Sequence, residues 1–244
     1  SQKQEESRKE LLAGISHDLR SPLTSIQAYV EGLLDGVAKT PALQQKYLTT
    51  IKTKAGDIQR MVAQLFLFSK MDMDEYPLHP ERLRLDELTA QLAEETAAQY
   101  AQKGLTLHMQ LCPAPVWVTA DAAELRRVLT NVLDNSAKYK DKAQAAMHIT
   151  LRRDGADWLL TLADDGPGVP PEALPKLFDV FYRSDPARQN PDRGSGLGLA
   201  IAAKAVARMG GSIAAENAAG GGLAILLRLP AEPEKAENAE GASV

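Results

Sequence analysis

His17 stands among residues that would equip it as a nucleophile. Asp18 follows it directly and can accept a hydrogen bond from one ring nitrogen, which fixes the tautomer and raises the nucleophilicity of the other nitrogen. Ser21 lies one helical turn beyond His17, over the same face. A lone histidine on a helix is most often a solvated side chain, but these neighbours favour a chemical role.

Pro22 is a further unusual feature of this stretch. A proline inside a helix removes a backbone donor and either costs about 3 kcal/mol or kinks the helix. A purely structural helix would usually avoid that cost. We therefore expect a local bend close to His17.

Asn131 and Asn135 form a second candidate site, because they lie one turn apart on a predicted helix and project from one face. Amide oxygens suit Mg²⁺, a hard cation that usually stays partly hydrated between protein and phosphates. Lys138, one turn after Asn135, could meet phosphate oxygens. Two asparagines alone more often mark only a polar helix face, so this pattern leaves both interpretations open.

Two glycine-containing segments could let a ligand approach the backbone. ADDGPGVP, residues 163–170, ends a predicted strand, and Asp164 there could accept a hydrogen bond from an exocyclic amine. GSGLGLAI, residues 194–201, opens a predicted helix whose first N–H groups could cradle a triphosphate. A Rossmann site is excluded, because we expect no parallel βαβ unit before this segment and no acidic residue about 20 positions later at a strand end.

A long helix, predicted over about residues 5–34, positions His17. Its apolar residues repeat in heptads, the pattern of a packed helical seam. With Leu12 at heptad position a, His17 falls at position f and faces away from that seam. The seam residues are Leu12, Leu19, Ile26 and Leu33 at one position, and Ile15, Pro22 and Tyr29 at the other.

A second helix is predicted from Pro41 to about Met73, after a turn over residues 36–42 in which Thr40 caps the helix. This helix has an apolar stripe of its own. A lone hairpin cannot bury both stripes, so we expect the chain to dimerise into a four-helix bundle. The stripe residues are Leu48, Ile51, Ala55, Ile58, Val62 and Leu65.

The pattern changes at YPLHP, residues 76–80, beyond which short strand-like runs alternate with helices. The predicted fold class is α+β, with a helical hairpin over residues 1–75, a linker over 76–80 and an α/β sandwich over 81–230 that has helices on one sheet face. Residues 231–244 have the composition of a disordered acidic tail. We predict strands at 82–85, 105–111, 116–119, 147–153, 158–163, 212–216 and 223–229, and helices at 86–103, 121–139 and 198–209.

Composition narrows the classes of function. The 244 residues hold enough apolar material for two modest domains, and the single cysteine, Cys112, fits a reducing cytoplasm better than a disulfide scaffold. The net charge of −4 argues against a broad nucleic-acid surface. No run approaches the roughly 20 apolar residues of a membrane-spanning helix, so we expect no direct membrane contact from this chain.

Taken together, the motifs resemble those of two-component sensor histidine kinases. SHDLRSPLTSI (residues 16–26) resembles the H-box, LTNVLDNSAKY (129–139) the N-box, DDGPG (164–168) the G1 box, LFDVFYR (177–183) the F-box and GSGLGLAI (194–201) the G2 box. They occur in the order found in that family. The resemblance covers roughly residues 5–230.

This resemblance implies a helical dimerisation and histidine-phosphotransfer domain followed by a Bergerat-type ATP-binding domain. His17 would be the phosphoacceptor, and Asp18 the base that assists its attack on the γ-phosphorus. Ser21, where relatives more often carry threonine or asparagine, would orient a water that dephosphorylates the partner. The partners would be a cognate response regulator and a second copy of the chain.

The same resemblance implies a site for ATP and Mg²⁺. Asn135 would be the main Mg²⁺ ligand, Tyr139 would pack against adenine and Asp164 would accept from the adenine amine. Residues 184–193 would form a lid over the nucleotide. The other residues of the site would be Asn131, Lys138, Gly166, Gly168, Phe178, Phe181, Arg183, Gly194, Gly196, Leu197 and Gly198.

The expected setting is the cytoplasmic part of a membrane-anchored sensor. Two other functions remain in view. An ATP-driven clamp of the gyrase or heat-shock chaperone kind shares the nucleotide-binding fold but lacks the H-box hairpin. A binding module that has lost catalysis would lack a key histidine, asparagine or glycine, and none of these is missing here.

Overall fold

The computed structural model describes residues 2–71, 76–180, 182 and 196–232, with side chains from residue 13 onwards. The chain divides into two compact units, Ser1–Tyr76 with Lys176–Ile201, and Pro77–Pro175 with Ala202–Val244. Within the described ranges, no helix is both long and apolar enough to cross a membrane.

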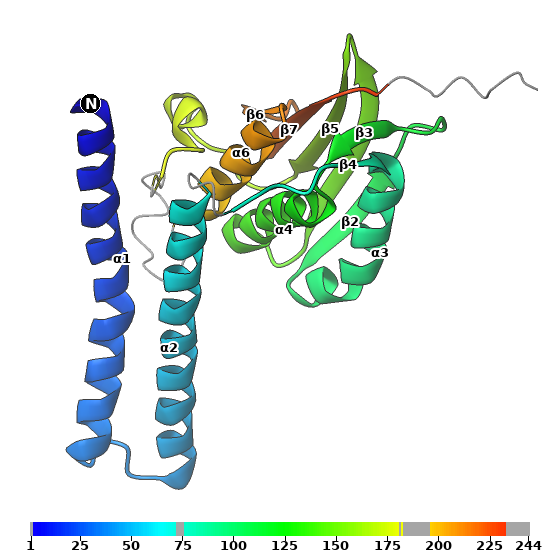
Figure 1. Cartoon of the computed structure of the whole chain (residues 1–244). Helices are drawn as coiled ribbons and strands as arrows, with labels where there is room; N and C mark the ends of the chain where they lie inside the picture. Colours follow the sequence, from blue (N-terminus) through cyan, green and yellow to red (C-terminus); the bar gives the residue numbers. More distant parts are fainter. Residues whose placement is uncertain (1, 72–75, 181, 183–195, 233–244) are drawn as a thin grey trace, which may run out of the picture. The chain divides into compact units, whose positions relative to one another are not determined.

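Two long helices, α1 (Gln2–Leu34) and α2 (Pro41–Lys70), form a hairpin (Figure 1). The second helix begins where the sequence predicts, because the Thr40 side chain accepts a hydrogen bond from Leu43 N at 3.2 Å and Pro41 occupies the first turn. The predicted end of this helix near Met73 lies outside the described residues. The predicted helical hairpin is therefore confirmed.

An aromatic pair and a glycine bring α1 and α2 together near their turn. The Tyr29 ring meets the Tyr47 ring edge-on, with centroids 4.9 Å apart. A Cβ on Gly32 would lie 2.8 Å from the Tyr47 ring, so a larger residue would push the ring away. Large apolar side chains nevertheless stay exposed along the hairpin: Leu23, Val30, Leu34, Val37, Leu48, Val62 and Phe66.

A five-stranded sheet frames the second unit, with strand order β2-β4-β5-β7-β6. β2 pairs with β4 in parallel, and the other neighbours in this sheet are antiparallel. β1 and β3 form a separate antiparallel pair. The strands are β1 (Glu81–Arg84), β2 (Leu105–Gln110), β3 (Trp117–Ala120), β4 (Ala145–Asp154), β5 (Asp157–Asp164), β6 (Ser212–Asn217) and β7 (Leu223–Pro230).

Helices α3 (Leu85–Gln102) and α4 (Ala122–Tyr139) lie along the sheet (Figure 1), and α6 (Gly198–Arg208) follows the second glycine-rich segment. Alternate residues of β4, Met147, Ile149 and Leu151, are buried against this helical layer. A helical hairpin followed by a mixed α/β sheet confirms the predicted fold class. The 3-10 helix Pro171–Lys176 was not predicted, because its short, proline-containing sequence shows no periodicity.

One expectation about topology is wrong. No parallel βαβ unit is expected from the sequence before the segment 194–201, yet β2 pairs in parallel with β4 across a connection that contains β3 and α4. The alternation of apolar residues along a strand does not depend on the direction of the neighbouring strand, so the sequence pattern could not predict the parallel pairing. The second ground for excluding a Rossmann site is also wrong, because Glu216 lies 20 positions after Gly196, near the end of β6. A Rossmann site is nevertheless excluded, because α6 leads into β6, which pairs antiparallel with β7.

Ala231 and Glu232 fall in the predicted tail, but both form backbone hydrogen bonds within the second unit. Ala231 N donates to Ala156 O at 3.1 Å, and Glu232 N donates to Trp117 O at 3.0 Å. The rest of that tail, residues 233–244, lies outside the described residues.

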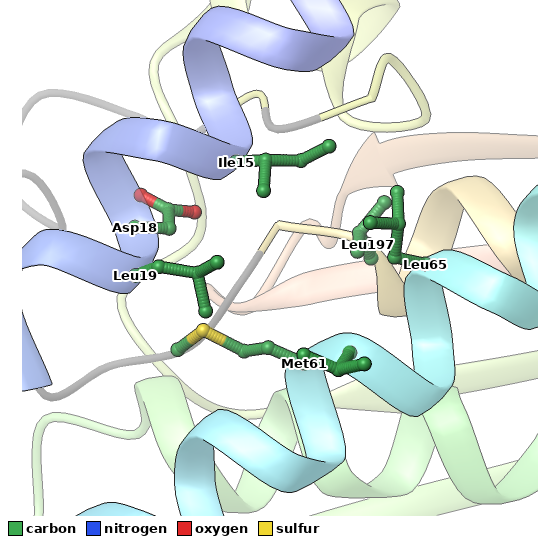
Figure 2. Close-up of a pocket in the computed structure, with 7 residues that line it drawn as sticks. Ile15, Asp18, Leu19, Met61, Leu65 and Leu197 are labelled. Carbon is green, nitrogen blue, oxygen red and sulfur yellow. The ribbon is translucent and has the colours of Figure 1, made fainter.

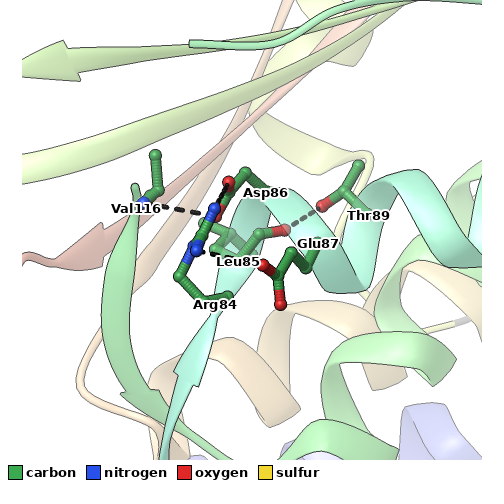
Figure 3. Close-up of polar contacts among 6 residues, drawn as sticks. All are labelled: Arg84, Leu85, Asp86, Glu87, Thr89 and Val116. Carbon is green, nitrogen blue, oxygen red and sulfur yellow. Dashed lines mark hydrogen bonds and ion pairs between the residues drawn. The ribbon is translucent and has the colours of Figure 1, made fainter. Parts of the chain in front are cut away.

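An ion-pair cluster joins β1 to the start of α3 (Figure 3). Arg84 Nε donates to Asp86 Oδ1 at 2.8 Å, and Val116 N donates to the same oxygen at 3.2 Å. Burial opposes ionisation of Asp86, but these two donors outweigh it and hold the pKa of this carboxyl below its usual value. The cluster thereby ties α3 to the strand segment that precedes β3.

Asp121 anchors the start of α4, as Asp86 anchors the start of α3. Its Oδ1 accepts from Ala123 N at 3.0 Å and Glu124 N at 3.1 Å, which caps the helix, and its Oδ2 accepts from His79 N at 2.9 Å. Burial disfavours the charged carboxyl, but the three backbone donors outweigh it and lower the pKa of Asp121. One side chain thus positions both the helix that carries Asn135 and the linker before β1.

Replacing Asp121 with alanine should lower the free energy of unfolding by about 1–2 kcal/mol, because a helix cap is lost. Since the pKa of Asp121 is lower in the folded chain, its contribution is present above the usual value of 3.8 and disappears as the pH falls further. Urea unfolding followed by circular dichroism at neutral and acidic pH measures both effects. Asp141→Ala removes an exposed carboxylate just after α4 and serves as the control, and an equal loss in both variants would contradict the capping role.

Candidate functional site

His17 projects from α1 into solvent, with 81% of its side chain exposed. The exposure predicted from heptad position f is therefore confirmed. Asp18 beside it is only 8% exposed, and its Oδ1 lies 3.2 Å from His17 Nδ1. The predicted contact between the two side chains is also confirmed. A tautomer with the proton on Nδ1 donates to Asp18 and leaves the lone pair of Nε2 facing solvent.

Apolar side chains surround the position of Asp18. A pocket in the first compact unit is lined by Ile15 and Leu19 of α1, by α2 residues that include Met61 and Leu65, and by Leu197 (Figure 2). Apolar surroundings lower the local dielectric constant, which strengthens a hydrogen bond between an imidazole and a carboxylate. This environment favours Asp18 as the group that holds the ring of His17.

Ser21 and Pro22 lie one turn further along α1. Ser21 is half-buried and Pro22 is buried. The helix continues through Pro22 to Leu34, so the proline does not end it. The structure thus keeps His17 and Ser21 on one uninterrupted helix.

The α4 helix carries the candidate metal ligands at the edge of its buried face. Asn131 and Asn135 are half-buried, Tyr139 is half-buried and Lys138 is exposed. The buried stripe beside them consists of Glu124, Leu125, Val128, Leu129, Val132, Leu133 and Ser136. Two amides at a partly shielded edge, followed by a lysine, supply oxygen ligands and a positive charge of the kind that a metal–phosphate complex requires.

Asp164, at the end of β5, is held through both carboxylate oxygens. Its Oδ1 accepts from Gly166 N at 3.0 Å and from Leu223 N at 2.9 Å. Its Oδ2 accepts from the Ser136 hydroxyl at 2.7 Å. A carboxylate can accept about four hydrogen bonds, so Asp164 retains capacity for one more donor, such as an exocyclic amine.

The turn after Asp164 depends on close backbone approach. Gly168 has φ of 67°, and a Cβ there would lie 2.7 Å from Asn217 Oδ1. Asn217 clamps the next residue, because its Oδ1 accepts from Val169 N at 3.0 Å and its Nδ2 donates to Val169 O at 2.6 Å. A Cβ on Gly222, with φ of 93°, would lie 1.9 Å from Asp164 O. Glycine is therefore required on both sides of this contact.

Asp165, the neighbour of Asp164, has a structural part. Its carboxylate accepts from Ala146 N at 2.8 Å and pairs with Lys142 Nζ at 2.8 Å. Burial opposes its ionisation, but Lys142 and the Ala146 N–H together lower the pKa of Asp165. The two adjacent carboxylates thus separate into one that anchors the sheet edge and one that faces the glycine turn.

The second glycine-rich segment is described from Gly196 onwards and belongs to the first compact unit up to Ile201. Gly196 has φ of 66°, Leu197 is buried and Gly198 begins α6. Phe178 is half-buried. Phe181, Arg183 and Gly194, with the expected lid over residues 184–193, lie outside the described residues.

Sequence reasoning missed two side chains that position Asp164 and its turn. Ser136 sits in the buried stripe of α4, where an isolated hydroxyl needs a partner, and that was the available signal. Asn217 gave no comparable signal, because its partner Val169 lies 48 residues away in the sequence. The structure brings Ser136, Asp164 and Asn217 together in the second unit.

Two family models match the chain. Residues 7–74 match the His Kinase A (phospho-acceptor) domain, and residues 120–233 match the family described as histidine kinase-, DNA gyrase B-, and HSP90-like ATPase. The first match contains His17, and the second contains Asn135 and Asp164.

Similar proteins cover most of the chain. The sensor protein SrrB of Staphylococcus aureus is 30% identical over 227 residues, which cover 93% of this chain and 38% of SrrB. The chain thus spans less than two fifths of that relative. Full-length ShkA in complex with AMPPNP is 25% identical with a TM-score of 0.65, covering 92% of this chain and 46% of ShkA. The histidine kinase ThkA in complex with response regulator TrrA is 21% identical with a TM-score of 0.74, covering 93% and 62%.

Proposed function

Because the chain belongs to the sensor histidine kinases, we propose that it uses Mg-ATP to phosphorylate its own His17 and then passes the phosphoryl group to an aspartate of a response regulator. The observation that carries this proposal is the contact between the exposed His17 and the shielded Asp18. The complex of ThkA with a response regulator supports the choice of partner.

In the proposed reaction, the lone pair on His17 Nε2 attacks the γ-phosphorus of ATP. A bond forms between Nε2 and phosphorus, and the bond from phosphorus to the bridging oxygen breaks, so ADP leaves. Positive charge develops on the ring, and Asp18 stabilises it through the Nδ1–H and then takes that proton. In the second step a carboxylate oxygen of the partner attacks the same phosphorus, the bond to Nε2 breaks, and the proton returns from Asp18 to Nδ1, so that His17 leaves as a neutral imidazole. Both steps require the exposure of His17.

Adenine and Mg²⁺ would bind to residues of the second compact unit. Asp164 would accept from the adenine amine, Tyr139 would pack against the base, and Gly166 and Gly168 would let it approach the backbone. Mg²⁺, held by Asn135 with Asn131 beside it, would neutralise charge on the phosphates. The fit rests on the donor chemistry of the α4 edge and on the anchored carboxylate of Asp164. Lys138, Phe178, Phe181, Arg183, Gly194, Gly196, Leu197 and Gly198 would complete the site.

The hairpin would pair with that of a second copy to form a four-helix bundle. Exposed apolar side chains on both helices support this, because Leu34 is 80% and Phe66 is 62% exposed in the single chain. Burial of such residues is the main driving force for association.

We further propose that the chain acts in the cytoplasm as part of a membrane-anchored sensor. Ser21 would orient a water for dephosphorylation of the partner.

Incubation with γ-labelled ATP tests the proposed function. A label on the chain that is labile in acid and stable in alkali identifies phosphohistidine. Release of free phosphate with no label on the chain would instead indicate an ATP-driven clamp. If the chain carries no label and no free phosphate is released, the chain is a binding module.

Replacing Asp18 with asparagine should slow autophosphorylation by roughly 10²- to 10⁴-fold, the usual contribution of a positioned base. The amide keeps the size of the side chain but cannot take the Nδ1 proton. Initial rates at saturating ATP measure the effect. Glu31→Gln neutralises an exposed carboxylate elsewhere on α1 and is the control, and matching rates in the two variants would leave Asp18 with no catalytic part.

A further inference from the structure

Ser136 holds the carboxylate of Asp164 in one orientation. The serine is 5% exposed and lies in the buried stripe of α4, and its hydroxyl donates to Asp164 Oδ2 at 2.7 Å. Hydrogen bonds from a hydroxyl to a charged acceptor are among the short and strong ones. Ser136 is the residue directly after Asn135, so one helical turn carries both the proposed metal ligand and this contact.

The two oxygens of Asp164 are held by different kinds of donor. Oδ1 accepts from the backbone N–H groups of Gly166 and Leu223, and Oδ2 accepts from Ser136. Rotation about the last bond of an aspartate side chain has only a weak intrinsic preference. With Oδ1 alone held, the carboxylate plane could therefore turn. Ser136 supplies the second anchor that fixes this plane.

The hydroxyl proton of Ser136 is committed to Asp164, so the lone pairs of the serine and the carboxylate present only acceptors at this point. Such a surface suits a donor such as the 6-amino group of adenine. It repels the 6-carbonyl oxygen of guanine, because two acceptors would face each other.

We propose that Ser136 is a positioning residue that sets the preference of this site for a 6-aminopurine, an inference that rests on the proposed binding of ATP. It acts through Asp164, whose acceptor oxygen it aims at the amine. A purely structural serine would instead support the fold and affect every purine nucleotide equally.

The test measures the affinities of the whole chain for ATP and for purine riboside triphosphate, which lacks only the 6-amino group, by titration calorimetry. Ser136→Ala should weaken ATP binding by roughly 3- to 10-fold, the range expected for one hydrogen bond. Binding of the analogue should change by less than about two-fold. The ratio of the two affinities should therefore fall. Ser136→Cys, a weaker donor of similar size, should give an intermediate ratio and serves if the alanine variant does not fold.

Thr89→Val is the matched control, because it removes another buried hydroxyl, which donates to Leu85 O at 2.7 Å within α3 (Figure 3). It should leave the ratio unchanged. Equal losses for ATP and the analogue in the Ser136 variants, or no loss for either, would overturn the inference while leaving the proposed function intact. Failure of the wild-type chain to bind ATP would overturn both.

Discussion

Replacing His17 with glutamine should abolish the covalent label from γ-labelled ATP. Glutamine has no ring nitrogen with a nucleophilic lone pair, so no bond to phosphorus can form. The affinity for ATP should stay within about two-fold of wild type, because Asn135 and Asp164, which would hold Mg²⁺ and adenine, belong to a different compact unit from His17. Label incorporation and equilibrium ATP binding, measured on the same preparation, separate the two properties.

His148→Gln is the matched control for this substitution. His148 is an exposed histidine on β4, far from α1 in sequence, and its ring stacks on that of His108. The control variant should incorporate label as the wild type does. Label that persists in His17→Gln would show that another residue accepts the phosphoryl group.

Replacing Asn135 with alanine should reduce Mg-dependent autophosphorylation by about 10²-fold or more, the scale seen when a group that stabilises developing charge is removed. The amide oxygen would be the main protein ligand of Mg²⁺, and alanine offers none. Initial rates over a range of Mg²⁺ concentrations measure the effect. Higher Mg²⁺ should restore part of the rate, since weaker metal binding can be offset by mass action.

Asp134→Ala provides the comparison on the preceding residue of α4. Asp134 accepts a hydrogen bond from Tyr100 at 3.1 Å and forms an ion pair with Lys103 at 3.2 Å, so its side chain contacts the C-terminal end of α3. Its loss should change the rate little, because its partners, Tyr100 and Lys103, are not among the residues proposed to bind Mg²⁺ or ATP. Equal rates in the two variants would place the metal on other groups.

Local chemistry made several features of the fold predictable. Thr40 and Pro41 mark the start of α2 because a cap and a helix-initiating proline act over a few residues. α4 begins at Ala122, within one residue of the predicted start, although its cap by Asp121 was not predicted. The exposure of His17 followed from heptad spacing, which depends only on helix geometry.

Long-range contacts were not predictable in the same way. The parallel pairing of β2 with β4 joins segments on either side of α4, and no short pattern encodes it. The contacts of Ser136 with Asp164 and of Asn217 with Val169 span 28 and 48 residues. A sequence motif identifies the residue types at a site. The side chains that orient those residues can lie far away in the sequence, because the sheet topology determines which segments are neighbours.

In the proposed reaction, His17 receives the γ-phosphoryl group of ATP. The most direct measurement is to locate the added phosphoryl group by tandem mass spectrometry, after brief incubation of the chain with Mg-ATP and handling at alkaline pH. We expect one phosphoryl group on His17, and none when Asn135 is replaced by alanine and Mg²⁺ is kept low. A phosphoryl group on a different residue, or an unmodified chain after ATP has been consumed, would contradict the proposed reaction.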